Sequence, residues 1–272
     1  MRWILALMVA FASLDAAAAT ATLEIASGER RLTYTQTQLL ARPDVRTLSI
    51  TDSVYGQRYT TFKAIPIANL FKGLAAPDLS MVRCNGTDGF SAILDKTRLF
   101  DTNPKASQAY LAIEDPRQPW PPLADQGASA GPFYLVWTDP QASAIGPEEW
   151  PYQIASLEIL PDPRREFPKA YPVSDAPAAV QRGFQSFRKN CFACHKINGD
   201  GAGTIGPDLN LPMNPTDYLN SQVLVRLIRN PASVRAWPGM AMRGFSVESL
   251  PDQELADLIA YLQYMSKTRA GP

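Results

Sequence analysis

The sequence has few of the cysteine and histidine residues that most structural metal sites and disulfide frameworks need. It contains one histidine, His195, and three cysteines. A four-ligand zinc site is therefore not expected, because only one further cysteine, Cys84, exists and it lies far upstream of the other two. An odd number of cysteines, two of them separated by only two residues, also argues against a disulfide framework.

The chain also lacks an excess of charge and, beyond its start, a long hydrophobic run. Lys plus Arg and Asp plus Glu both total 26, so we expect neither nucleic acid nor an anionic membrane surface as a partner. A basic start, an apolar run and four alanines predict a secretory signal peptide over residues 1–19. An uncleaved anchor is the alternative, but the run is shorter than the roughly 20 residues that span a bilayer. We expect no transmembrane segment after signal removal, and a periplasmic location.

Proline divides the rest of the chain. Five prolines fall within residues 161–177, which predicts an extended linker rather than a helix or a central strand. Before it, residues 20–160 show short β-rich runs separated by turn residues, typical of a mainly β, α+β domain with a few helices. After it, residues 178–272 show apolar side chains at helical spacing, which predicts a small all-α domain. The clearest β-rich runs are residues 45–50, 89–94 and 133–137, and the chief helical pattern before the linker is 67–74.

The helical domain carries one motif with specific chemistry, Cys191-Phe192-Ala193-Cys194-His195. Two thiols at this spacing can straddle a porphyrin edge while the adjacent imidazole lies beneath the iron. A thioredoxin-like redox pair is the competing interpretation, but the βαβ pattern is missing and the adjacent histidine has no part in it. The motif predicts one covalently bound haem c on Cys191 and Cys194, with His195 as an axial iron ligand.

With this motif, residues 178–266 resemble class I cytochromes c. The pattern Gly183-x-x-x-Phe187-x-x-x-Cys191 is similar to the N-terminal helix of that family. The resemblance implies that Gly183 permits a close crossing with a C-terminal helix around residues 257–262.

A second stretch, Gly203-Thr204-Ile205-Gly206-Pro207-Asp208-Leu209, resembles the family's loop on the proximal side of the haem. The resemblance implies that the backbone carbonyl of Pro207 accepts a hydrogen bond from His195 and fixes the orientation of the imidazole.

The second axial ligand cannot be another histidine, so methionine is the next candidate. A thioether favours ferrous iron and raises the reduction potential. Family sequences often carry Met-Pro-x-Phe before the last helix, and Met242-Arg243-Gly244-Phe245 keeps the spacing without the proline. The resemblance implies Met242 as the ligand, with Met240 as the runner-up and Met213 behind both. Arg243 either pairs with a haem propionate or is solvated.

Fragments of the first domain resemble the pterin-binding domain of sulfite-oxidase-type molybdenum enzymes. In that family a cysteine thiolate binds the metal, and His, Arg and Lys side chains hold the pterin phosphate. Here Cys84 is the only available thiol and no histidine lies outside the haem motif, so we expect a domain without molybdopterin. Cys84 is then a small apolar residue in a strand. The fragments that carry the resemblance are residues 62–71, 87–91 and 131–136.

These observations favour an electron carrier over an enzyme. In the first hypothesis the haem domain transfers single electrons while the N-terminal domain docks a periplasmic redox protein, such as a dehydrogenase or another cytochrome. In the alternative, the N-terminal domain is a molybdopterin-dependent oxidoreductase that binds its metal through Cys84 and passes electrons to its own fused haem. A sensory haem that takes up a diatomic ligand is a third possibility.

Overall fold

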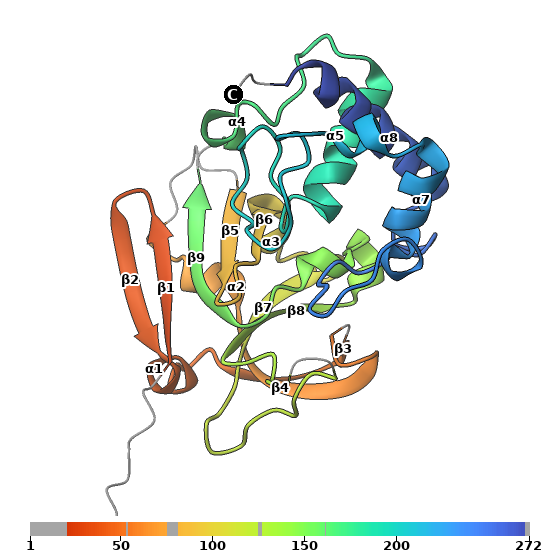
Figure 1. Ribbon diagram of the computed structural model, residues 1–272. Helices are drawn as coiled ribbons and strands as arrows, with labels where there is room; N and C mark the ends of the chain where they lie inside the picture. The colour runs from red at the N-terminus through yellow and green to blue at the C-terminus, as the bar shows by residue number, and fades with distance from the viewer. Residues whose placement is uncertain (1–20, 53, 75–80, 125–126, 161, 270–272) are drawn as a thin grey trace, which may run out of the picture.

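The computed structural model describes residues 21–52, 54–74, 81–124, 127–160 and 162–269. The expected signal peptide lies outside these residues. A β-rich region built from two sheets is followed by a helical region (Figure 1). None of the helices in the described part of the chain combines the length and the hydropathy that a membrane-crossing segment needs.

The first sheet has five strands in the order β2-β1-β9-β5-β6. Its strands are β1 (Thr22–Ser27), β2 (Arg30–Thr35), β5 (Met81–Gly86), β6 (Ser91–Asp95) and β9 (Ile154–Leu160). Strand β9 pairs in parallel with β1 and antiparallel with β5, and the outer pairs β1–β2 and β5–β6 are antiparallel. The last strand of the region therefore lies in the middle of the sheet.

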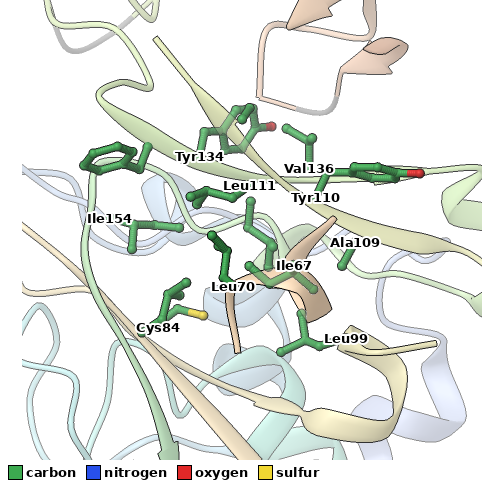
Figure 2. Packing of buried hydrophobic residues seen from close by; sticks show 14 of the residues in the cluster. Ile67, Leu70, Cys84, Leu99, Ala109, Tyr110, Leu111, Tyr134, Val136 and Ile154 are labelled. Carbon is green, nitrogen blue, oxygen red and sulfur yellow. The ribbon is translucent and has the colours of Figure 1, made fainter. Parts of the chain in front are cut away.

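The second sheet is antiparallel, with four strands in the order β3-β4-β7-β8. Its strands are β3 (Arg46–Asp52), β4 (Arg58–Pro66), β7 (Gln108–Ile113) and β8 (Phe133–Thr138). One apolar cluster contains side chains from both sheets, among them Cys84 of β5 and Leu111 of β7 in Figure 2. Short helical turns complete the region, which confirms the expected mainly β domain with a few helices. They are α1 (Gln36–Leu40), α2 (Ile67–Leu70), α3 (Lys96–Leu99), η1 (Pro140–Ser143) and η2 (Pro147–Glu149).

The helical region is organised around the crossing of its first and last long helices. Its elements are α5 (Ala178–Asn190), α6 (Pro215–Tyr218), α7 (Ser221–Arg229), η3 (Pro231–Ser233) and α8 (Asp252–Lys267). Phe187 of α5 packs on Tyr261 of α8, with ring centroids 5.2 Å apart. A Cβ atom at Gly183 would overlap the carbonyl oxygen of Asp257, so the close crossing that the resemblance implied is confirmed.

The sequence predicts an extended linker over residues 161–177, but the linker is not extended throughout. It contains a one-turn helix, α4 (Pro163–Glu166). Asp162 caps this turn by accepting from the Arg164 N–H, and Pro163 occupies the first helical position, where its missing N–H costs nothing. The linker then packs on the helical region: Phe167 and Ala170 are buried in the helical core.

The helical region packs against β6, an edge strand of the five-stranded sheet. Ile93 of β6 packs against the helical core, while Ala193 belongs to the apolar cluster of the β-rich region. The Ser91 N–H donates to the Ala193 carbonyl at 3.1 Å, and the Thr204 N–H donates to the Gly89 carbonyl at 3.3 Å. The turn that carries the cysteine motif is therefore part of the contact between the two regions.

Candidate functional site

The cysteine motif lies at the C-terminal end of α5. Cys191 ends the helix, and its N–H donates to the Phe187 carbonyl at 2.8 Å. The N–H groups of Cys194 and His195 donate back to the Cys191 carbonyl at 3.1 and 2.9 Å. These bonds close a tight turn, so one short backbone segment presents both thiols and the imidazole.

The surroundings of the two thiols favour an uncharged sulfur. Burial raises the pKa of Cys191 and of Cys194, the latter to about 12, and the nearby charge of Glu148 raises both further. A thiolate that binds a metal is disfavoured in such a place, whereas a thioether carries no charge to desolvate. Neither thiol is in a disulfide. The turn therefore fits covalent attachment to a porphyrin.

A backbone carbonyl orients the imidazole of His195. Its Nδ1 lies 2.8 Å from the carbonyl oxygen of Pro207. Because a carbonyl only accepts, Nδ1 carries the proton and Nε2 keeps its lone pair for a metal. Burial lowers the pKa of His195, which favours the neutral ring, while the bond to Pro207 acts in the opposite direction. A neutral imidazole with a free Nε2 fits an axial iron ligand.

Gly206 allows the proximal loop to approach this ring. A Cβ atom at Gly206 would overlap the imidazole of His195. The Gly206 N–H donates to the Cys194 carbonyl at 2.9 Å, which ties the loop to the motif. The loop thereby limits the orientations that the ring can adopt.

Three buried asparagines hold the chain beyond the motif against α8. Asn210 donates from Nδ2 to Oδ1 of Asn198 at 2.7 Å and to the Met265 carbonyl at 2.8 Å. Asn214 donates to Oδ1 of Asn210 at 2.9 Å and to the Leu262 carbonyl at 3.0 Å. This network has no signal in the sequence, because each asparagine also suits an ordinary turn and only the folded chain brings the three together.

The methionine candidates lie in two different loops. Met240 and Met242 are half-buried in the segment between η3 and α8, whereas Met213 precedes α6 and is 51% exposed.

Arg229, the last residue of α7, fixes the chain just beyond Met242. Its Nη1 donates to the carbonyls of Phe245, Ser246 and Leu250 at 3.1, 3.0 and 2.6 Å. Its Nη2 pairs with Asp252 at 2.6 Å. This role of Arg229 has no signal in the sequence, since an arginine at the end of a helix is common and its partners are spread over the following loop.

Cys84 lies away from this site, in the core of the β-rich region. It sits in β5, with Ala92 and Leu157 as its neighbours on the adjacent strands. Figure 2 shows its side chain in the same apolar cluster as Leu70 and Ile154. Burial raises the pKa of the thiol to about 12. In the described part of the chain, no group of three or more His, Cys, Asp or Glu side chains is placed to hold a metal. Cys84 thus packs as a small apolar residue in a strand.

Comparison with known proteins identifies the helical region. The family model for cytochrome c matches residues 180–266, about a third of the chain. No curated protein matches the chain. The β-rich region lies outside the family match. Residues 180–266 are a cytochrome c domain, which carries one covalent haem c on Cys191 and Cys194 and performs haem-based electron transfer.

Proposed function

We propose that this protein is a periplasmic monohaem electron carrier whose iron is held between His195 and Met242. The observation that carries the proposal is the bond between His195 Nδ1 and the Pro207 carbonyl, which leaves Nε2 for the iron. When bound, the haem supplies a one-electron couple. The protein's contribution is to hold the imidazole in one orientation, through Gly206 and Pro207, so that little rearrangement accompanies electron transfer.

Met242 is proposed as the second axial ligand rather than Met240. Both side chains are half-buried in the same loop. The chain is fixed from Gly244 onward, where a Cβ atom would overlap the Arg229 carbonyl and where the Phe245 N–H donates to the Ile228 carbonyl at 3.0 Å. Met242 is two residues from this fixed segment, and a ligand closer to a fixed backbone is the better positioned one.

The β-rich domain is proposed to dock a periplasmic redox protein and to bind no molybdopterin. Its sequence fragments resemble the pterin-binding domain of sulfite-oxidase-type enzymes, yet its only thiol is Cys84, which is buried in the apolar core. A periplasmic location rests on the signal-like residues 1–19. Complexes between electron-transfer proteins commonly have small interfaces and short lifetimes. A dedicated docking domain would make the choice of partner more selective.

Ligand substitution tests the assignment of the axial methionine. Met242→Leu removes the thioether, so the near-infrared band of the oxidised protein that reports sulfur-to-iron ligation should disappear and the reduction potential should fall. Met240→Leu is the matched control and should keep the band. Loss of the band in Met240→Leu alone would transfer the ligand role to Met240.

Metal analysis separates the carrier from the enzyme. Purified full-length protein should contain one iron per chain and no stoichiometric molybdenum. A partner captured from periplasm should reduce or oxidise the haem when the two are mixed. One molybdenum per chain would instead support the fused molybdopterin oxidoreductase.

A further inference from the structure

The 3₁₀ turn η2 is held rigidly next to the haem motif. Glu149 accepts from the Gly146 N–H at 2.7 Å and pairs with Arg98 at 2.8 Å. The Glu149 carbonyl accepts from the indole N–H of Trp137 at 2.7 Å. On the side of the helical domain, a Cβ atom at Gly146 would lie 2.9 Å from Cε of Lys189 in α5. The turn is therefore fixed from the β-rich domain and packed against the helix that ends in the motif.

The turn between β5 and β6 holds the same motif from a second direction. The Gly89 carbonyl accepts from the Thr204 N–H, and the Ser91 N–H donates to the Ala193 carbonyl. Ala193, which lies between the two cysteines, is only 6% exposed and packs in the core of the β-rich domain. Two separate elements of that domain thus contact α5 and the turn that carries the cysteine motif.

Glu148, in the middle of η2, is one of two carboxylates whose charge acts on the thiols; the other, Asp88 in the turn between β5 and β6, acts on Cys194. The charge of Glu148 acts on both Cys191 and Cys194. Glu148 has no hydrogen bond or ion pair among the described residues. The positive charge of Arg243, which is next to Met242 in the sequence, lowers the pKa of Glu148. Because both sulfurs become thioethers of one porphyrin, a charge that acts on both sulfurs would also act on the haem that they hold.

The environment of Glu148 is consistent with a role toward the haem. Glu148 is half-buried, and partial burial of a carboxylate that has no partner costs free energy. Here burial raises the pKa of Glu148 to about 7, and Arg243 offsets only part of that effect. Glu149, its neighbour, is by contrast fully engaged in holding the turn.

We propose that the β-rich domain forms one wall of the haem site and places the Glu148 carboxylate at the thioether edge, where its negative charge lowers the reduction potential. Ferric haem carries one more positive charge than ferrous haem, so a nearby carboxylate stabilises the oxidised form more. The inference rests on the proposed electron-transfer function. It gives the N-terminal domain a role in setting the driving force, separate from docking.

Redox titration of full-length, haem-loaded variants tests this role. At about pH 8.5, above the pKa of Glu148, Glu148→Gln should shift the equilibrium toward ferrous haem by up to about tenfold, which corresponds to about 59 mV. Glu148→Asp keeps the charge and should stay closer to the wild type. Glu29→Gln is the matched control, because Glu29 is an exposed carboxylate of the same domain, and it should leave the potential unchanged.

The outcomes distinguish this inference from the function on which it rests. Equal potentials for the wild type, Glu148→Gln and Glu29→Gln, with covalent haem and reversible cycling intact, would overturn the role of Glu148 alone. A wild-type protein that holds no haem or does not cycle would overturn the electron-transfer proposal itself. If Glu148→Gln does not fold, Glu148→Lys serves as the second variant. It should raise the potential further, and an unchanged value there also overturns the inference.

Discussion

Gly206 occupies a position where the smallest side chain would collide with the proximal histidine. Gly206→Ala places a methyl group against the His195 ring, so we expect the bond between imidazole and iron to weaken while both thioethers persist. The variant should retain covalent haem on a denaturing gel. Its absorption spectrum should shift toward high-spin iron, and the reduced protein should bind carbon monoxide.

The neighbouring Ile205→Ala is the control for this variant. Ile205 is 36% exposed, so its truncation should leave the spectrum as in the wild type. A low-spin spectrum in Gly206→Ala would show that the ring tolerates the methyl group, and that the proximal loop does not set its orientation.

Asp257, which lies at the crossing of α5 and α8, makes the stability of the protein depend on pH. The hydrogen-bonded pair with Arg182, at 2.6 Å, holds the pKa of Asp257 below its ordinary value. A lowered folded-state pKa stabilises the protein above the unfolded pKa of about 3.9, and this stabilisation is lost as pH falls through the folded value. Arg182 is 59% exposed, so solvent screening keeps this stabilisation small.

We therefore expect Asp257→Asn to be less stable than the wild type at pH 7, with the difference shrinking at about pH 3.5. Urea unfolding at both pH values measures it. Asp175→Asn removes an exposed carboxylate from the linker and should show no such pH-dependent difference. A difference that stayed constant from pH 7 to about pH 3.5 would contradict the linkage.

At the scale of single residues, the sequence identified what depends on local spacing. The two cysteines and the histidine are neighbours in the chain, and one turn of backbone is enough to present them together. Glu148 could not be found in this way. Its charge acts on the thiols only because η2 packs against α5, and these two elements are distant in sequence.

At the scale of elements, the loop that carries Met242 depends on Arg229. This side chain satisfies three backbone carbonyls and one carboxylate. Arg229→Met keeps much of the apolar stem but leaves those acceptors without their donor. We expect the free energy of unfolding to fall by about 1.5–3 kcal/mol, the range for hydrogen bonds to charged groups, and the near-infrared band from methionine ligation to weaken.

Arg226→Met is the matched control for that change. Arg226 lies on the same helix, one turn earlier, and is exposed. Its substitution should change stability by less than about 0.5 kcal/mol and leave the spectrum intact. Equal effects of the two substitutions would mean that the loss of positive charge, and not the clamp, is responsible.

Elements with a strong apolar period were predictable, whereas elements fixed by distant partners were not. Helices α5 and α8 follow the period of their buried residues, and β3, β6 and β8 fall on the runs that the turn residues delimit. The one-turn helix α4 has no such period, and its proline, which disfavours a helix interior, is tolerated in the first turn. The parallel pairing of β9 with β1 has no local signal at all, since it joins opposite ends of the domain.

At the scale of the whole molecule, the proline-rich linker gave no indication that the two domains are in contact. A proline-rich connection suggested two modules joined by a spacer. Instead, the linker buries Phe167 and Ala170 in the helical core, and β6 packs against the same domain. The β-rich domain therefore holds the haem-binding turn in a fixed orientation.

Truncating the apolar contact of β6 should separate the domains without unfolding either. Ile93 packs against the helical core, so Ile93→Ala weakens that contact and allows the linker to open more often. A protease cuts a segment in proportion to the population of its open form when opening is fast. We expect limited proteolysis in the linker to release a haem-stained C-terminal fragment severalfold faster than in the wild type.

Leu32→Ala is the control for this variant. Leu32 lies on the far edge strand β2 and is 39% exposed, so its truncation should not change the rate. If both variants release the fragment at the wild-type rate while circular dichroism shows folded protein, Ile93 does not hold the domains together, and the polar contacts at Gly89 and Ala193 carry the interface instead.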